Sequence, residues 1–245
     1  MFRHKGINRT FIHNLRLATL LSFVAGMVNI TGVLSVKTLT TNVTGHFAYF
    51  AEEIMRKDLA AAITFFVFTL FFLLGAFIAN FISEFVAKTN PNSSHIIPIS
   101  LEIIILAVVA FFGTSSDLIS LKGKSMAFAM LFAMGIQNSL VTKISQSTVR
   151  TTHLTGLFTD LGIELSQLFF YKKPEENKKL KTNIYLRISI ISFFFMGCVL
   201  GGFLFNILEI KTLFVACFFL LIALLYDSLR LQYHLFKRRK KYSKG

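Results

Sequence analysis

The sequence predicts an all-α membrane protein, a polytopic helical bundle of six long spans plus two short half-helices at Thr-Gly pairs. Two observations predict this class. The chain of 245 residues is 54% hydrophobic and 16% charged, whereas soluble domains are typically about 45–50% apolar and about 25% charged. The apolar residues also form stretches of about 20, the length of helix that crosses a bilayer, and no strand pattern occurs. The excess apolar side chains are therefore expected to lie in lipid.

The basic charge of the chain does not point to nucleic acid. With 26 Lys+Arg against 12 Asp+Glu, the formal net charge is +14, which in a soluble protein would suggest a nucleic-acid partner. Here no aromatic or polar side chains are interleaved with the basic residues for base contact. The apolar content also excludes disordered tails and disulfide-rich secreted modules. We expect the lipid bilayer as a partner, and no nucleic acid, metal or cofactor.

Six apolar stretches are long enough to be transmembrane helices. In chain order they are Leu15–Val36, Leu59–Phe81, Ile96–Phe112, Ser125–Ile144, Ile184–Ile207 and Thr212–Leu231. The first follows several basic residues, as a signal peptide would, but it is longer than a typical signal h-region and five further spans follow it. It is therefore interpreted as the first transmembrane helix.

Three basic blocks orient the spans. They are the N-terminal residues from Arg3 to Arg16, the loop from Lys172 to Arg187, and the tail 237–245. Because basic residues are retained on the cytoplasmic side of a membrane, we expect all three blocks, and both termini, in the cytoplasm.

The chain repeats itself at a spacing of about 110 residues. The stretch FVAGMVN at Phe23–Asn29 matches FAMGIQN at Phe132–Asn138, and the segment Thr40–Ile54 matches Thr151–Leu165. In the second match threonines, a glycine, a phenylalanine and a glutamate coincide. This self-similarity predicts two homologous halves.

The repeat leaves the number of crossings open. The halves cover residues 10–113 and 120–236 of a single membrane domain, residues 1–245. If the two Thr-rich segments do not cross the membrane, there are six spans and inverted halves, as in many secondary transporters; if both cross, there are eight spans and parallel halves. The cytoplasmic side then holds 20 of the 26 basic residues with six spans and 21 with eight. Equivalent loops carry equal charge, Arg56-Lys57 and Lys172-Lys173, which slightly favours eight.

Glycines in the spans are interpreted as positions of close helix packing. They are Gly26, Gly75, Gly135, Gly197 and Gly201. Gly75 and Gly197 also align with each other in a third, weaker match between the halves.

Uncharged polar residues around the two Thr-Gly pairs are the candidate binding site. Threonine can cap a helix, so each pair is expected to start a half-helix, and polar backbone at membrane depth is tolerated only inside the protein or along a watery cavity. Hydroxyls, amides and free N–H groups would suit an anionic or strongly hydrogen-bonding solute. The candidates are Asn29, Thr40, Thr41, Thr44, Gly45, Gln137, Asn138, Thr151, Thr152, Thr155 and Gly156. Asn29 and Asn138 have an alternative role as hydrogen bonds that only hold helices together.

Three acidic residues are candidates for proton coupling, since ionisable groups at membrane depth are expensive and usually functional. They are Glu53, Glu164 and Asp160. For Glu53, which lies beside Glu52 and Arg56, an exposed carboxylate is the alternative. No phosphate-binding lysine motif, GxSxG elbow or HExxH pair occurs, and we expect no enzyme.

At these residues the chain resembles the YoaK-like family of bacterial membrane proteins, whose function is unknown. The matching elements are Gly26-Met27-Val28-Asn29, Thr44-Gly45-His46, Gly135-Ile136-Gln137-Asn138 and Thr152-His153-Leu154-Thr155-Gly156. Asn29 stands where the family favours an acid, and His46 where it favours Asn. The resemblance implies a bacterial inner-membrane protein, but no substrate.

The leading hypothesis is a small-solute transporter or permease with its site between the two Thr-Gly segments. The alternative is a non-transporting membrane scaffold, sensor or partner subunit. The solute and the oligomeric state are not readable from the sequence.

Overall fold

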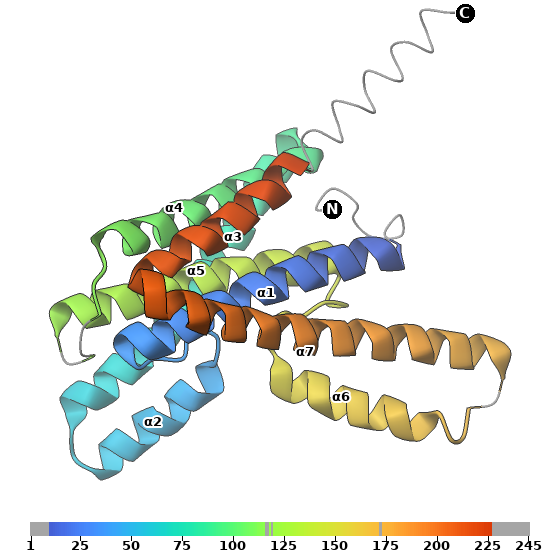
Figure 1. Cartoon of the computed structure of the whole chain (residues 1–245), viewed down its shortest axis with the longest axis horizontal. Helices are drawn as coiled ribbons and strands as arrows, with labels where there is room; N and C mark the ends of the chain where they lie inside the picture. Colours follow the sequence, from blue (N-terminus) through green and yellow to red (C-terminus); the bar gives the residue numbers. More distant parts are fainter. Residues whose placement is uncertain (1–9, 116–117, 119, 172, 227–245) are drawn as a thin grey trace, which may run out of the picture.

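The computed structural model describes residues 10–115, 118, 120–171 and 173–226, which are almost entirely helical (Figure 1). The helices are α1 (Phe11–Val36), α2 (Val43–Met55), α3 (Leu59–Thr89), α4 (Ile96–Phe112), α5 (Leu121–Ser145), α6 (Leu154–Gln167) and α7 (Pro174–Leu208). Short 3₁₀ turns, η2 (Pro91–Ser93) and η3 (Glu209–Lys211), follow α3 and α7, and a final helix covers residues 212–226. No strand occurs among the described residues, so the predicted all-helical class is confirmed. The predicted basic tail, 237–245, lies outside the described residues.

Four helical stretches in the described part of the chain are long and apolar enough to cross a membrane. They are Phe11–Val36, Leu59–Thr89, Leu121–Ser145 and Pro174–Tyr226. The last, of 53 residues, contains two of the predicted spans, because the chain turns at Glu209 (φ 50°, ψ −135°). The predicted span Ile96–Phe112 forms α4 with the same bounds, although its 17 residues are fewer than in these stretches. The chain is therefore a multi-pass membrane protein.

Helix α7 begins ten residues before the predicted span. The prediction followed apolar residues alone and started at Ile184, whereas the helix starts at Pro174. Proline suits the first position of a helix, since its missing N–H has no partner there. Glu175 and Glu176 lie in the first turn, where carboxylates interact favourably with the helix dipole. Polar residues thus extend this helix beyond its apolar part.

Contacts along the helices show their relative directions. Helix α1 runs parallel to α7, because Phe11 lies against Tyr185 and Phe23 against Gly197. Helix α3 runs parallel to α5 in the same way, with Phe68 against Phe128 and, farther along both helices, Gly75 against Phe132.

Helices α1 and α5, which open the two matched segments, run antiparallel. Gln137 contacts Leu21, while Met130, earlier in α5, lies near Gly32, later in α1. The slight preference for parallel halves and eight spans is therefore wrong. Helix α2 has 13 residues and α6 has 14, so each is about 20 Å long at 1.5 Å per residue. That length is shorter than the hydrocarbon core of about 30 Å.

Two pairs of glycines allow the tightest helix contacts. A Cβ placed on Gly26 would lie 2.1 Å from the carbonyl oxygen of Phe194, and one on Gly197 would lie 2.1 Å from that of Phe23. The pair Gly75 and Gly135 joins α3 to α5 with the same 2.1 Å approach on both sides. These four glycines therefore bring the backbones of α1 and α7, and of α3 and α5, into direct contact, as close-packing positions should.

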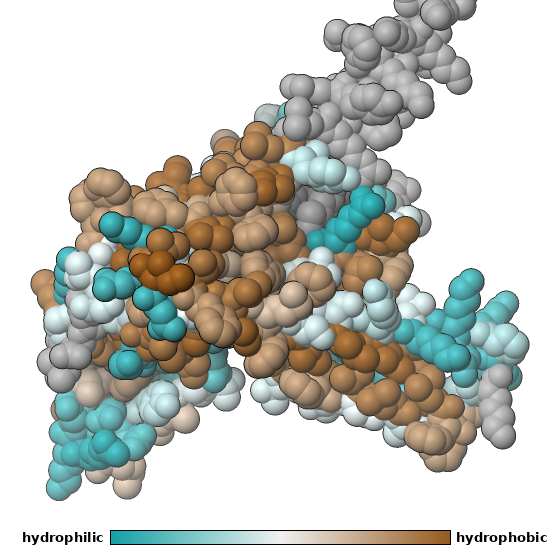
Figure 2. Space-filling view, viewed as in Figure 1, coloured by the Kyte–Doolittle hydropathy of each residue, from teal (hydrophilic) through white to brown (hydrophobic). Residues whose placement is uncertain are grey.

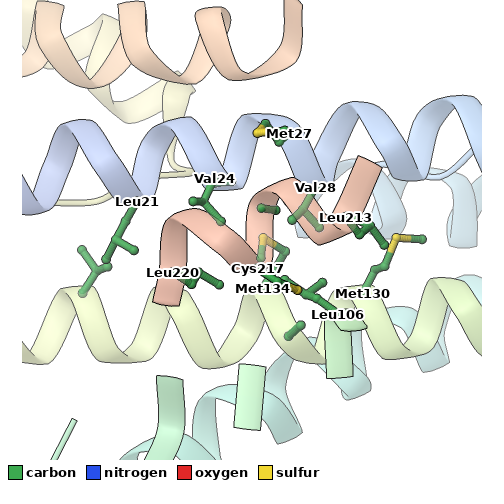
Figure 3. Packing of buried hydrophobic residues seen from close by; sticks show 14 of the residues in the cluster. Leu21, Val24, Met27, Val28, Leu106, Met130, Met134, Leu213, Cys217 and Leu220 are labelled. Carbon is green, nitrogen blue, oxygen red and sulfur yellow. The ribbon is translucent and has the colours of Figure 1, made fainter. Parts of the chain in front are cut away.

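The core lies where α1, α4, α5 and the 212–226 helix meet (Figure 3). Leu21, Val24 and Val28 of α1 point toward Met134 of α5 and Cys217 of the 212–226 helix. Their packing removes the central helices from lipid, which leaves α2 and α6 at the periphery.

On the face that Figure 2 shows, apolar side chains gather across the middle of the bundle and hydrophilic ones toward its ends. Large side chains such as Phe77, Phe111, Phe195 and Phe203 are more than 60% exposed. Large apolar patches are rare on soluble monomers, and these exposed side chains fit contact with lipid.

Both ends of the described chain lie on the same side of the bundle. The Arg16 guanidinium in α1 donates to the Tyr226 hydroxyl at 3.3 Å. The start of α1 and the end of the 212–226 helix therefore lie next to each other, on one side of the bundle.

Candidate functional site

The first Thr-rich segment folds back onto α1. After Val36 the chain turns at Lys37, whose φ of 55° is left-handed. The Thr40 N–H and the Thr41 hydroxyl then both donate to the Asn29 side-chain oxygen, each at 3.0 Å. Asn29 therefore holds the segment beside α1. Since an oxygen accepts both bonds, a carboxylate at this position would accept the same two donors.

Helix α2 starts one residue earlier than the Thr-Gly pattern predicts, and its cap is Asn42. The Asn42 side chain accepts from the Gly45 N–H at 3.0 Å. Thr44 is exposed, so the prediction that it caps the helix is wrong; asparagine, which caps at least as well as threonine, lies two residues earlier.

His46 is a buried structural residue of this half. Its Nε2 donates to the Leu39 carbonyl at 2.7 Å, and its ring lies 5.2 Å from that of Phe68. The ring thus fastens the Thr-rich segment to α3. No group of three His, Cys, Asp or Glu that could hold a metal occurs among the residues that the structure describes.

The second Thr-rich segment is held by α5 in a similar way. The Asn138 side-chain amide donates to the Thr152 hydroxyl, and the Thr151 hydroxyl donates to the Asn138 oxygen at 3.5 Å. Two left-handed residues, Gln146 and Ser147, turn the chain out of α5. Each half therefore fastens its segment through the asparagine that was predicted for the site.

Helix α6 begins after His153, not at a capping threonine. No side-chain hydrogen bond caps this helix, and Thr155 is exposed, so the predicted cap is wrong here too. A Cβ on Gly156 would lie 2.5 Å from the His153 ring. An alanine here would therefore require the exposed His153 side chain to move from its place over the start of the helix.

Gln137 faces away from its neighbour Asn138. Its amide donates to the Leu21 carbonyl of α1 at 2.9 Å, and the side chain is 1% exposed. It therefore joins α1 to α5 and does not lie with the threonines.

Two adjoining cavities flank the second segment. One, of about 570 Å³, lies against α3 and α5 and includes Asn80, Asn138 and Thr152 in its wall. The other, of about 450 Å³, lies between the first turns of α6 and the part of α7 around Asn183 and Arg187. Their walls share Ser147 and its neighbours Arg150 and His153. Neither wall contains a residue of the first segment, so these cavities do not join the two Thr-Gly segments.

A charged cluster closes the far wall of the smaller cavity. Arg187 of α7 donates through Nε and Nη2 to both oxygens of Glu164, at 2.7 and 3.0 Å. Its Nη1 donates to Asp160 Oδ2 at 2.8 Å. Glu164 is 10% exposed and Asp160 is 50% exposed at the side chain. Both predicted acids thus have one cation as their partner.

Arg187 is a charged residue of this cluster that the sequence analysis did not name as a site candidate. It was counted in a cytoplasmic basic block, although it lies inside the predicted span Ile184–Ile207. A charge inside a span is itself a signal of function, and this signal would have found it. Glu102, in α4, was missed as well: it is fully buried, and neither carboxylate oxygen has a hydrogen-bond partner among the described residues.

The first half carries aromatic residues where the second carries this cluster. The alignment of Thr40 with Thr151 matches Tyr49 in sequence with Asp160. The alignment of Gly75 with Gly197 matches Phe65 with Arg187. The Tyr49 and Phe65 rings lie 5.2 Å apart. The third acid, Glu53, lies 3.8 Å from Arg56 of its own half, near the end of α2. The charged site therefore occurs at the second segment alone among these matched positions.

A family model described as "Protein of unknown function (DUF1275)" matches residues 17–226, or 210 of the 245 residues. This match agrees with the resemblance to the YoaK-like family. No curated protein and no solved structure matches the chain.

Proposed function

The chain belongs to the DUF1275 family of proteins of unknown function, and from its polar cavities we propose that it is a transporter of a small polar solute. The observation that supports this function most directly is the pair of cavities, about 570 and 450 Å³, that share Arg150 and His153. Volumes of about 300–1,000 Å³ are typical of small-molecule sites. We place the solute there, beside α6, rather than between the two Thr-Gly segments.

An inverted repeat is the second part of the proposal. Helices α1 and α5 run antiparallel, and each carries a glycine that contacts the other half and an asparagine that holds a Thr-rich segment. Inverted repeats with broken or short helices beside the site are a common design of secondary transporters. Here α2 and α6 are the short helices.

The repeat suggests how access could alternate. The glycine contacts bind α1 tightly to α7 and α3 tightly to α5, so each tight pair joins helices of both halves. We propose that these two pairs move as rigid bodies against each other around the contact of α1 with α5. The cavity of about 570 Å³, whose wall comes from α3, α5 and the residues that follow α5, would then open or close at the boundary of one body.

We propose a cytoplasmic-membrane location with both termini inside the cell. The side of the bundle that holds Arg16 and Tyr226 also holds the loop before α7, and in the six-span arrangement it carries 20 of the 26 basic residues. An excess of basic residues on one side is the usual sign of the cytoplasmic face.

Cysteine labelling of whole cells tests this topology. Met55→Cys, at an 82% exposed position, is expected to react with an impermeant maleimide from outside, and Asn90→Cys only after lysis. Wild type gives the background, because Cys198 and Cys217 lie in apolar helices. Eight spans would reverse the two results, so labelling of Asn90→Cys in intact cells would contradict the proposed arrangement.

A stability screen of the purified protein tests solute binding. The chain has no tryptophan, so unfolding is followed with a thiol-reactive fluorophore that reports exposure of Cys198 and Cys217. A solute at 100 times its Kd is expected to stabilise the folded state by about 2.7 kcal/mol. Arg150→Gln should abolish this response, whereas Arg56→Gln, a matched change outside the cavities, should retain it.

Uptake into proteoliposomes then decides between carrier and sensor. A stabilising solute should accumulate in vesicles that contain wild type and not in those with Arg150→Gln. Binding without uptake would favour the scaffold, sensor or partner-subunit alternative, and a screen without any stabilising solute would reject the site.

A further inference from the structure

We infer that the cavity between α6 and α7 accepts a zwitterionic solute, one that carries a cationic and an anionic group in the same small molecule. This inference rests on the proposed function and specifies its substrate class. It rests on Arg150 and Asp160, which line the same cavity and are not paired with each other.

Of the four charged residues around the cavity, two are fully paired with each other and two can still bind a ligand. Glu164 uses both oxygens on Arg187, so these two residues neutralise each other. Asp160 accepts a hydrogen bond from the same guanidinium through one oxygen, Oδ2, and Oδ1 accepts none from the described residues. Its side chain is half exposed, so it can accept a further cationic donor.

Arg150 is the basic residue of the cavity that has no acidic partner among the described residues. It lines the cavity from the segment that follows α5, and it is exposed. No carboxylate in the described part of the chain lies within 4 Å of its guanidinium. Arginine presents a planar fork of donors that matches a carboxylate, so this side chain fits the anionic end of a solute.

The charge balance favours a zwitterion over a simple anion or cation. Around the cavity two basic side chains, Arg150 and Arg187, accompany two acidic ones, Asp160 and Glu164. A solute with a single charge can pair with only one of the two available groups, Arg150 or Asp160. A solute with both charges can satisfy Asp160 and Arg150 together.

The other wall residues fit a small, mostly polar ligand. Asn183 of α7 and Ser147 offer hydrogen bonds, while Leu157 and Leu186 offer a limited apolar surface. The volume of about 450 Å³ accommodates an amino acid or a betaine. The first half, with Tyr49 and Phe65 at the matched positions, lacks these charges there.

The test compares solutes that differ by one charged group. Purified wild-type protein is titrated with L-alanine, propionate and ethylamine, and then with pools of amino acids and with glycine betaine, while unfolding is followed by cysteine exposure. We expect stabilisation by zwitterions, with propionate and ethylamine at least tenfold weaker than the best zwitterion. Asp160→Asn should weaken the zwitterion at least tenfold and leave propionate unchanged, and Arg150→Gln should weaken both.

The folded state of the variants is checked separately. Asp160→Asn keeps the two bonds of Arg187 to Glu164, so its melting temperature without solute should stay near that of wild type. Glu52→Gln, which removes an exposed carboxylate of α2, is the matched control and should bind as wild type does.

Other outcomes distinguish failure of this inference from failure of the proposed function. Stabilisation by simple anions that does not depend on Asp160 would overturn the zwitterion and leave a solute carrier. Stabilisation by glycerophosphoethanolamine, but by no amino acid or betaine, would assign the cavity to a phospholipid headgroup and overturn the soluble substrate. A response to no solute in any class would overturn both proposals.

Discussion

Replacing Gly26 or Gly135 by alanine is expected to destabilise the protein by about 3 kcal/mol. The new Cβ would lie 2.1 Å from the carbonyl oxygen of Phe194 in the first case and of Phe72 in the second. Both obstacles are backbone atoms of a packed helix, so neither can move aside as the end of a side chain would. The helices must therefore separate and lose contacts along their length.

The control for this prediction is a glycine with open space around it. Gly162 in α6 has no atom within 4 Å of an added Cβ, so Gly162→Ala should stabilise the protein, by up to about 1 kcal/mol, through helix propensity. Gly202, whose nearest neighbour would be 3.7 Å away, should also tolerate alanine. Melting temperatures in detergent measure all four variants. Equal effects at Gly26 and Gly162 would show that α1 and α7 do not pack this closely.

Replacing Glu164 by glutamine is expected to cost about 2–3 kcal/mol. Glutamine keeps one acceptor but removes the charge that neutralises Arg187, and breaking a buried ion pair on one side typically costs about 3–5 kcal/mol. We expect a smaller value because the Arg187 side chain is 23% exposed and Asp160 remains bonded to it. The loss is expected to loosen α6 from α7.

Removing both partners separates the charge effect from the packing effect. The double variant Glu164→Leu with Arg187→Met should be more stable than the Arg187→Met variant alone, since it leaves no buried Glu164 charge without a partner; Asp160, which is half exposed, loses the same cation in both variants. Glu52→Gln is the control: its partner Arg56 is 65% exposed and Glu52 is 44% exposed, so the change should cost less than about 1 kcal/mol. Additive single and double effects would indicate that Arg187 and Glu164 do not interact.

Much of the helical framework could be predicted because it depends on local composition. The apolar runs around Ile96–Phe112 and Leu59–Phe81 are long enough to be recognised without knowing their neighbours, and both form helices. The glycines of these spans are also visible in the sequence, since small residues allow close packing wherever they lie. Their partners are not visible, because Gly26 contacts residues around 194 and 198 that are far along the chain.

The candidate site could be predicted only in part. Asn29 and Asn138 were candidates for solute binding, with structural hydrogen bonds as the alternative, and both hold a Thr-rich segment. Thr44 and Thr155 do not cap α2 and α6, because the helices begin one residue earlier than the Thr-Gly pairs. Arg187 was grouped with a cytoplasmic loop because its sequence neighbours are basic. Its partner Glu164 lies 23 residues earlier in the chain, so this ion pair is not visible from those neighbours.

By itself the sequence determined that this is an all-helical membrane protein, where its spans lie and which polar residues are unusual within them. These properties are sums over neighbouring residues, and lipid selects for them directly. Only the tertiary structure decided that α1 and α5 run antiparallel, that Arg187 joins Asp160 and Glu164, and that the cavities lie at the second Thr-rich segment. The physical reason is that the six-span and eight-span topologies differ by only one basic residue on the cytoplasmic side, so charge does not distinguish them. Packing does, and it depends on which helix surfaces meet.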